Sequence, residues 1–262
     1  MAEALAGRSA IITGGARGLG LELARAFVAA GARVVVTGRD QTALDAAHAE
    51  LGVQAIRADV SDPGDCAAVV EEAGPVTALV NNAGITGPVG PVETNDWDEW
   101  VATIATNLFG PVLMCRAVLP AMRERGYGKI VNLSGGGATA PRPNFSAYAA
   151  AKVAVVRFTE TLARELDGTG IDVNAIAPGA LNTRMRDDVL QAGPERAGAE
   201  YAQALEREGA PFEPATRLAV FLASAAGDGV SGRLIAALWD DWQRLAEQDL
   251  DADAYTLRRV VP

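Results

Sequence analysis

Short runs of β-branched residues alternate with longer helical patterns along the chain, and this alternation limits the fold more than any other feature. The predicted strands cover residues 9–13, 33–37, 53–57, 76–80, 129–133, 171–176 and 233–237. Helical patterns cover residues 18–30, 41–51, 97–124 and 144–167, and another opens at Ser61-Asp62-Pro63. Repeated βα units with right-handed crossovers produce a doubly wound parallel sheet. We therefore expect a single-domain α/β Rossmann-like fold of about seven strands with helices on both faces.

Composition agrees with such a fold and narrows the range of partners. Hydrophobic residues make up 49% of the chain but aromatic residues only 5%, which favours a core of Ala, Val, Leu and Ile between helices and sheet. The net charge of −10 argues against nucleic acid or an acidic membrane surface as a partner. The start of the chain is too short and polar for a signal peptide, and no apolar run reaches membrane-spanning length. We expect a cytoplasmic protein that does not enter a membrane.

Cysteine and histidine usage gives no indication of a metal site. Cys66 and Cys115 lie in helical patterns without metal-ligand spacing, so both are predicted to be buried free thiols. His48 is the single histidine and lies on a helix expected to be exposed. Catalysis by a histidine-based metal centre or triad therefore has no support.

A glycine-rich turn follows the first predicted strand. It reads Thr13-Gly14-Gly15-Ala16-Arg17-Gly18-Leu19-Gly20 and opens a helix. Gly14 permits a tight turn, Gly18 lets the backbone approach a pyrophosphate, and Gly20 allows the helix to pack closely on the sheet. N–H groups at the start of the helix then bind the phosphates. The alternative is a glycine turn without a ligand.

The predicted helix at 144–167 begins with a tyrosine and a lysine at helical spacing. Tyr148 and Lys152 lie one turn apart on the same face, with alanines between them. An ammonium beside a phenol favours the phenolate and lowers the tyrosine pKa, which suits a general acid or base. An ordinary, partly exposed helix face is the alternative.

Four motifs in this order resemble the short-chain dehydrogenase/reductase family. They are the Gly-x-x-x-Gly-x-Gly turn, Asn81-Asn82-Ala83-Gly84 after the fourth strand, Tyr148-x-x-x-Lys152, and Pro178-Gly179 after the sixth strand. The resemblance covers residues 7–237 and implies hydride transfer between a nicotinamide and an alcohol or carbonyl carbon. Tyr148 would act as general acid/base and Lys152 would assist it. Residues 1–238 would form the NAD(P)-binding oxidoreductase domain.

The same resemblance implies the rest of the site. The residues expected to bind the cofactor are Gly14, Arg17, Gly18, Leu19, Gly20, Arg39, Asp59, Val60, Asn81, Ala83, Gly84, Tyr148, Lys152, Pro178, Gly179 and Thr183. Asn82 would instead stabilise the sheet. Asn107 matches the active-site asparagine of the family, and a structural hydrogen bond at a helix kink is the other interpretation of this buried amide.

Two arginines favour NADP(H) over NAD(H). The second strand ends in Thr37-Gly38-Arg39 with no carboxylate before Asp40, where an acidic residue would bind the ribose 2′-hydroxyl. Arg39 and Arg17 are able to bind a 2′-phosphate by charge-assisted hydrogen bonds. In the alternative interpretation both arginines are solvated surface residues.

The family's usual active-site serine is missing. Gly135 stands thirteen residues before Tyr148, where the resemblance places that serine, and the nearest hydroxyl is Ser134. A one-residue offset at a strand end sends a side chain to the opposite face. We predict that the adaptable Gly135-Gly136-Gly137 loop lets Ser134 reach the site. Otherwise the position is vacant, or it is filled by Thr139, Ser146 or the substrate.

Two further segments bear on the substrate and on assembly. Residues 182–214 are expected to close over the ligand, and Arg142, Arg184 and Arg186 are candidates for an anionic or hydroxylated substrate, although solvated loop charges are the simpler interpretation. Residues 239–262 form an extension with Trp239 and Trp242, which packs either on the same domain or on a neighbouring subunit. Because relatives assemble through their long helices, a homodimer or homotetramer is expected.

The motifs together lead to one favoured function and one alternative. The favoured function is an NADP(H)-dependent oxidoreductase that interconverts a secondary alcohol and a ketone of a small molecule, of sugar-like, polyol or polyketide type. The catalytic residues would be Tyr148, Lys152, Asn107 and Ser134. The alternative is a non-redox relative, either a dinucleotide-binding regulator or a lyase or isomerase, which the replacement of serine by Gly135 favours.

Overall fold

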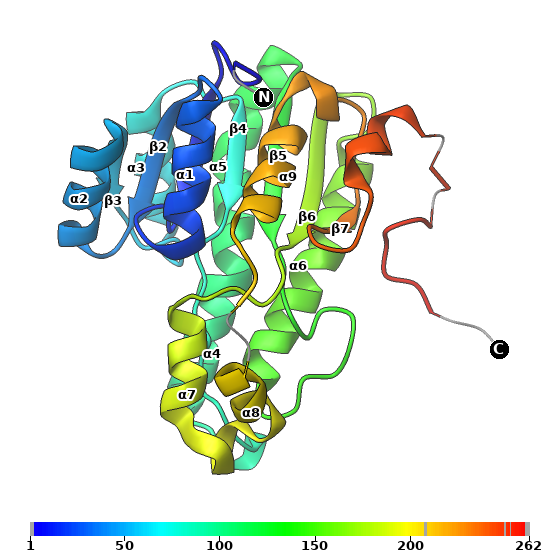
Figure 1. Cartoon of the computed structure of the whole chain (residues 1–262). Helices are drawn as coiled ribbons and strands as arrows, with labels where there is room; N and C mark the ends of the chain where they lie inside the picture. Colours follow the sequence, from blue (N-terminus) through cyan, green and yellow to red (C-terminus); the bar gives the residue numbers. More distant parts are fainter. Residues whose placement is uncertain (1–2, 207–208, 249, 252, 260–262) are drawn as a thin grey trace.

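All seven strands of the computed structural model are parallel and form one sheet (Figure 1). The structure describes residues 3–206, 209–248, 250–251 and 253–259. The strands are β1 (Ser9–Thr13), β2 (Arg33–Gly38), β3 (Gln54–Arg57), β4 (Ala78–Asn81), β5 (Gly128–Leu133), β6 (Ile171–Ala177) and β7 (Leu234–Ala236). Their order is β3-β2-β1-β4-β5-β6-β7, so the direction of winding reverses between β1 and β4. The predicted doubly wound Rossmann-like fold is confirmed.

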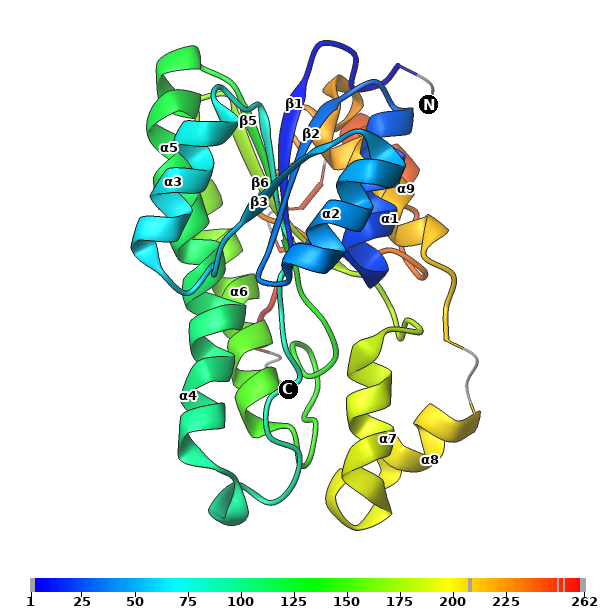
Figure 2. The same ribbon diagram turned by 90° about the vertical axis from the view of Figure 1, so that its left-hand side faces the viewer.

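Helices cover both faces of the sheet, as the edge-on view shows (Figure 2). One face carries α1 (Gly18–Ala29), α2 (Gln41–Leu51) and α9 (Glu213–Ala223), and the other carries α3 (Pro63–Ala73), α5 (Gly110–Arg125) and α6 (Ser146–Glu165). Neighbouring residues of β1 show the alternation, since Ile12 packs in the first layer and Ile11 in the second. Because both faces are covered, apolar residues from both sides of the central strands are buried.

Local signals explain where the helices begin and end. The carboxylates of Asp40, Asp62 and Asp96 accept hydrogen bonds from backbone N–H groups in the first turns of α2, α3 and α4 (Trp97–Ile104). Helices α2 and α5 end at Gly52 and Gly126, both with φ of 67°. Helix α1 differs, because Arg17 precedes it without a side-chain cap, and its first N–H groups are left for another partner.

The long helix predicted at 97–124 is interrupted. A π-helical turn over Ala105–Phe109 separates α4 from α5. By length and composition alone, the stretch Trp97–Arg125 could cross a membrane, so the expectation that no apolar run reaches that length is wrong. In this fold, α5 packs against α3 and the sheet, where Met114, Val118 and Met122 belong to the second core layer.

The remaining elements lie around one end of the sheet. Helices α7 (Arg184–Ala197) and α8 (Ala199–Glu206) stand beyond the strands' carboxyl ends (Figures 1 and 2). The two tryptophans that follow β7 differ in exposure. Trp242 is buried, 5.5 Å from the Phe221 ring between centroids, whereas Trp239 is 83% exposed. The two cysteines are buried free thiols, as predicted.

Candidate active site

A cavity of about 1410 Å³ lies at the carboxyl ends of the strands. This is where ligands bind in open α/β sheets, and the volume exceeds the roughly 300–1,000 Å³ of typical small-molecule sites. Of the predicted cofactor-binding residues, only Asn81 is missing from the described residues that line it. The cavity therefore joins the glycine turn after β1 to the Tyr148–Lys152 pair of α6.

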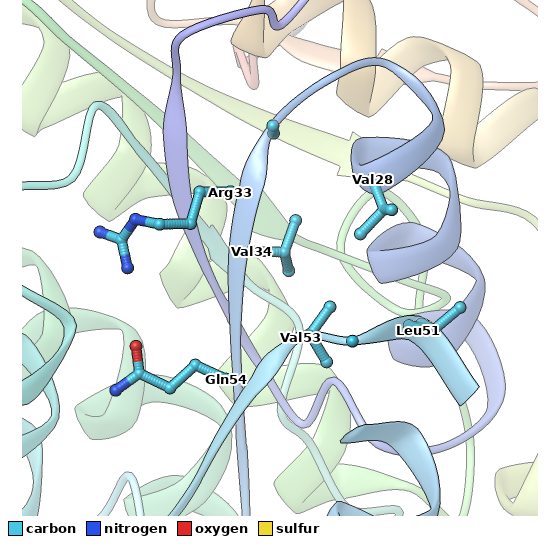
Figure 3. Close-up of a pocket in the computed structure, with 8 residues that line it drawn as sticks. Val28, Arg33, Val34, Leu51, Val53 and Gln54 are labelled. Carbon is cyan, nitrogen blue, oxygen red and sulfur yellow. The ribbon is translucent and has the colours of Figure 1, made fainter. Parts of the chain in front are cut away.

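A second hollow of about 320 Å³ lies at the opposite, amino end of β2 and β3 (Figure 3). Apolar side chains of Val28, Val34, Leu51 and Val53 point into it. The Arg33 guanidinium turns away from these side chains and donates to the Ala73 carbonyl at 2.7 Å. This hollow brings no group of catalytic side chains together.

The glycine turn has the geometry that a pyrophosphate requires. An ideal Cβ on Gly20 would lie 2.0 Å from the Gly14 carbonyl oxygen, and one on Gly14 would lie 2.9 Å from the Ala83 Cα atom. Gly18 has φ of +49°, and the Thr183 methyl group would be its nearest neighbour at 3.7 Å. The turn is therefore packed tightly inward, while the uncapped N–H groups of α1 are available to phosphate oxygens. These residues fit a dinucleotide.

The side chains of the two asparagines at the end of β4 point to different sides of the sheet. Asn81 faces away from the cavity, and its Nδ2 donates to Asn132 Oδ1 at 2.9 Å on β5. Asn82 lines the cavity and donates through Nδ2 to the Thr13 and Gly14 carbonyls at 2.9 and 3.2 Å. Asn82 thus ties β4 to the glycine turn. The side chain of Asn81 lies on the α5 side of the sheet, and its contact with the cofactor stays a prediction.

The arginines at the far end of the cavity are already paired with carboxylates. Arg39 Nη1 lies 3.4 Å from Asp59 Oδ2, and Arg17 forms an ion pair with Asp40. Hydrogen bonds from the backbone of α2 and from Arg17 hold the pKa of Asp40 below its usual value. Both guanidinium groups are more than half exposed, so a 2′-phosphate could compete for them.

Tyr148 and Lys152 are both buried at the cavity wall. Lys152 Nζ lies 5.6 Å from the centroid of the Tyr148 ring and donates to the Leu133 carbonyl at 2.7 Å. Burial lowers the pKa of Lys152 to about 8. Burial also raises the pKa of Tyr148, and the opposing influence is Arg142, so the expected lowering by Lys152 is not found in the free chain. Desolvation of the phenolate outweighs the neighbouring charges.

Asn107 lies in the π-helical turn and is fully buried. Its side chain accepts from the Ile85 N–H and donates to the Ile85 carbonyl, both at 2.8 Å. A Cβ on Gly84 would lie 3.2 Å from Asn107 Oδ1 and 3.7 Å from Lys152 Nζ. The amide therefore forms a structural hydrogen bond at a helix kink and also adjoins the lysine, so both interpretations of this residue have geometric support.

Gly135, and not Ser134, faces the Tyr148 hydroxyl. An ideal Cβ on Gly135 would lie only 2.6 Å from Tyr148 Oη. Ser134 borders the cavity, yet its Oγ atom is buried and has no partner among the described residues. The Ser134 N–H donates to the Ile176 carbonyl at 2.8 Å and continues the strand pairing, so a role for Ser134 at the substrate oxygen stays a prediction.

Several contacts of the site have no signal in the sequence. Arg142 stacks over Phe145 and Tyr148, with its Cζ 4.0 and 5.2 Å from the ring centroids, and its Nη2 donates to Glu200 on α8 at 3.0 Å. On the other side, Thr86 donates to Asp188 of α7 at 2.7 Å. These partners lie 58 and 102 residues apart, so no local pattern could have paired them. Among the described residues, no group of three or more His, Cys, Asp or Glu side chains could hold a metal ion.

Fold and site together define a nicotinamide-dinucleotide oxidoreductase, and comparison with known proteins agrees. Residues 8–193 match the family described as short chain dehydrogenase, and the chain belongs to the short-chain dehydrogenase/reductase family. It is 41% identical over 246 residues to galactitol 2-dehydrogenase (L-tagatose-forming) of Cereibacter sphaeroides, which covers 88% of this chain and 94% of the relative. The protein is thus an oxidoreductase that acts on a CH–OH/C=O pair.

Two further relatives differ in cofactor. A 2-dehydro-3-deoxy-L-rhamnonate dehydrogenase (NAD(+)) of Sphingomonas sp. is 39% identical over 191 residues, covering 71% of this chain and 77% of the relative. Actinorhodin polyketide ketoreductase, solved with NADPH, superposes with a TM-score of 0.80 at 32% identity, covering 90% of this chain and 97% of that one. The family therefore leaves the choice between NAD(H) and NADP(H) to local residues.

Proposed function

We propose that this protein interconverts a secondary alcohol and a ketone with NADP(H), with Tyr148 as the general acid/base. The observation that carries the proposal is the convergence of Tyr148, Lys152 and the glycine turn on one cavity. When bound, the nicotinamide would supply or accept the hydride. The residues expected to hold the dinucleotide are those predicted from the sequence, which, apart from Asn81, line the cavity together with Asn82.

The geometry suits Tyr148 as a proton donor to a ketone oxygen. Because burial raises its pKa, the phenol is protonated at neutral pH, and it gives this proton as the carbonyl carbon gains the hydride. Lys152, buried nearby, would stabilise the phenolate that remains. Alcohol oxidation reverses both transfers. Asn107 is a positioning residue in this scheme, because both ends of its amide hold Ile85.

Turnover by Tyr148 is tested directly by mixing the protein with NADPH and carbonyl compounds and following NADPH absorbance. Suitable probes are L-tagatose, 2,3-butanedione and ethyl acetoacetate. Tyr148→Phe should lower kcat by about 10³-fold, within the usual contribution of general acid–base catalysis, and leave the Kd for NADPH within two-fold. Tyr127→Phe is the matched control, because Tyr127 bonds Asp228 away from the cavity. Equal activity of the two variants would reject the role of Tyr148.

The preference for NADP(H) rests on Arg39 and Arg17 at the adenosine end of the cavity. A 2′-phosphate would draw both guanidinium groups from their carboxylate partners, since phosphate offers more acceptors and charge. Arg39→Ala should lower the NADPH-to-NADH ratio of kcat/KM by about ten-fold or more. Arg25→Ala is the control, because Arg25 pairs with Glu22 and Glu50 outside the cavity. An unchanged ratio in Arg39→Ala would reject the preference.

A polyhydroxylated substrate fits the polar groups at the other end. Arg142, Glu200, Thr86, Asp188 and Gln203 line the cavity there, so donors and acceptors stand close together. Sugar hydroxyls both donate and accept, and the relative that forms L-tagatose from galactitol supports the same class. In the reduction direction with NADPH, kcat/KM for L-tagatose should exceed the value for the less polar ethyl acetoacetate by at least ten-fold. A higher value for the ester would favour a polyketide-type substrate.

The absence of a hydroxyl at Gly135 favours a second candidate function. A protein that binds the dinucleotide without hydride transfer would retain the glycine turn and have no need of the serine. Tight NADPH binding with no oxidation across the whole carbonyl panel would support that non-redox function. Measurable turnover of any one probe excludes it.

An oligomer is supported by exposed apolar side chains on the helical face formed by α4, the π-helical turn and α6. Trp97 is 68% exposed and Phe109 51%, and Val101 and Val153 lie on the same elements. Light scattering should report a dimer or tetramer for the full chain, and Trp97→Glu with Phe109→Glu should reduce its mass. Leu205→Glu on α8, equally exposed in the wild type, is the control. A monomeric wild type would reject the assembly.

A further inference from the structure

The carboxylate of Glu160 lies at the centre of an anchoring cluster on α6. Its side chain is 7% exposed, and Oε1 accepts the Leu257 N–H at 2.7 Å. Oε2 forms ion pairs with Arg157, one turn earlier on the helix, and with Arg258 at 3.3 Å. Removing one partner of a buried charge cluster is costly, because the remaining charges lose their compensation. The cluster therefore ties the end of the chain to α6.

Arg157 and β7 provide further anchors for the same segment, the described residues 239–248, 250–251 and 253–259, which we name the C-terminal segment. Arg157 Nη2 donates to the Leu257 carbonyl at 2.8 Å. Leu234 N–H donates to the Tyr255 carbonyl at 2.7 Å, and Arg233 donates to the Asp251 carbonyl at 2.9 Å. Because β7 is the last strand of the sheet, these bonds cover part of an otherwise open edge. Figure 1 shows the segment running beside β7.

The C-terminal segment also packs on a small apolar cluster that includes Ala138, the residue that follows the loop of Gly135. Leu257 packs against the cluster of Ala138, Val156 and Ala175. The Ala138 N–H donates to the Gly135 carbonyl at 3.3 Å, and Gly135 in turn faces the Tyr148 hydroxyl. A series of neighbouring groups therefore runs from Glu160 through Leu257 and the apolar cluster that includes Ala138 to Gly135 and the Tyr148 hydroxyl.

The same segment forms one side of the cavity. Trp239, Asp240, Tyr255, Thr256 and Leu257 line it. Three successive glycines give the loop at 135–137 little rigidity of its own. The C-terminal segment, which packs beside this loop, would supply the rigidity that three glycines lack. The loop is also the place where the family's usual serine is absent.

We propose that Glu160 is a positioning residue, which anchors the C-terminal segment so that Leu257 holds the Gly135–Ala138 loop against Tyr148. The effect on turnover rests on the proposed function, whereas the effect on loop rigidity does not. Loss of the anchor loosens the loop, and the Tyr148 proton is then transferred from a less fixed position.

Hydrogen exchange of the cofactor-free full chain tests the structural part. Glu160→Ala should increase exchange about ten-fold in residues 135–142 as well as in residues 253–259. Glu165→Ala on the same helix, where the side chain is exposed, should change neither. Faster exchange of the C-terminal segment alone, with the loop unchanged, would mean that the segment only covers the sheet edge, and would overturn the proposal.

A milder variant keeps the test decisive if Glu160→Ala does not fold. Leu257→Ala removes the packing of this side chain on the cluster of Ala138, Val156 and Ala175 and leaves the hydrogen bond from the backbone N–H at position 257 to Glu160 in place. It should raise loop exchange about three-fold. Unchanged loop exchange in folded Leu257→Ala overturns the proposal irrespective of Glu160→Ala.

Kinetics with 2,3-butanedione and NADPH test the functional part. Glu160→Ala and Leu257→Ala should lower kcat by about ten-fold and three-fold, with the KM for NADPH within two-fold of wild type, because the glycine turn is untouched. An unchanged kcat, or a rise in the KM for NADPH that accounts for the whole loss, would reject the positioning role. If wild type oxidises no NADPH while the loop exchange responds as expected, the proposed function is rejected, but the role of Glu160 in holding the Gly135–Ala138 loop is supported.

Discussion

Two glycine-rich turns border the cavity, and they need glycine for different reasons. In the turn after β1, the atoms nearest to an ideal Cβ of Gly14 and of Gly20 belong to the backbone, namely the Ala83 Cα at 2.9 Å and the Gly14 carbonyl oxygen at 2.0 Å. In the turn after β5, the atoms nearest to an ideal Cβ of Gly135 and of Gly136 belong to side chains, namely the Tyr148 hydroxyl at 2.6 Å and Arg142 Cδ at 3.8 Å. The first turn is fixed by the fold, and the second is shaped by the catalytic residues around it.

This difference determines how each turn responds to change. A backbone obstacle cannot move without shifting a strand or a helix, so substitution in the first turn disturbs folding and cofactor binding together. A side chain moves more easily, so substitution in the second turn disturbs chemistry and spares the fold. Stability and turnover should therefore separate between the two turns.

The largest effect is expected at Gly20. In Gly20→Ala the new Cβ meets the Gly14 carbonyl oxygen, and the free energy of unfolding should fall by about 4 kcal/mol, a value typical of severe backbone strain. The Kd for NADPH should rise at least 100-fold. Urea unfolding and fluorescence titration measure both. Gly136→Ala is the matched control, because its nearest neighbour would be Arg142 Cδ at 3.8 Å; a similar loss there would remove the distinction between the turns.

Lys152 gives the next largest effect, and it acts through pH. Its pKa in the folded chain is about 8, below the usual 10.5, so the unfolded chain binds more protons between these values. The contribution of Lys152 to the free energy of unfolding therefore rises with pH from about 8 to about 10.5, by at most about 1.4 kcal/mol per pH unit. The difference in unfolding free energy between wild type and Lys152→Met should follow that slope. A flat difference would show that Lys152 is not desolvated.

Gly135 should show a smaller effect, confined to chemistry. In Gly135→Ser the Cβ would lie 2.6 Å from Tyr148 Oη, so the hydroxyl has to shift from its position at the cavity wall. Although this change restores the family's usual serine, kcat should fall about ten-fold with stability nearly unchanged. Gly135→Ala shares the Cβ and should behave alike. A serine variant faster than wild type would show that the loop moves aside easily.

The smallest effect is expected one residue earlier. Ser134→Ala removes a buried hydroxyl that has no partner among the described residues, so turnover should stay within about two-fold and stability should not decrease. A loss of more than ten-fold in kcat would mean that Ser134 is recruited to the substrate oxygen after all.

What could be predicted from the sequence follows the same division. Buried β-branched runs and the glycine turn have local causes, and the seven strands and the turn's position at a helix start were predicted correctly to within about two residues. Which residues lie beside Tyr148, in contrast, depends on packing between segments that are distant in the sequence. Strand register decided between Ser134 and Gly135, and between Asn81 and Asn82, and a one-residue difference reverses the face of a strand. The hydrogen bond of Arg142 with Glu200 and the packing of Leu257 on the cluster that includes Ala138 join distant segments, so the sequence did not reveal them.

The π-helical turn at Ala105–Phe109 has a consequence for how this chain tolerates change. A π turn holds one residue more than an α turn, so α5 is rotated by about 100° relative to a helix that continued α4 without it. This rotation lets Trp97 and Val101 face outward while Met114 and Val118 face the sheet. Deleting one residue within 105–109 would restore a regular helix but turn either Asn107 or the core face of α5 the wrong way. The length of this stretch is therefore constrained as strictly as the identity of its asparagine.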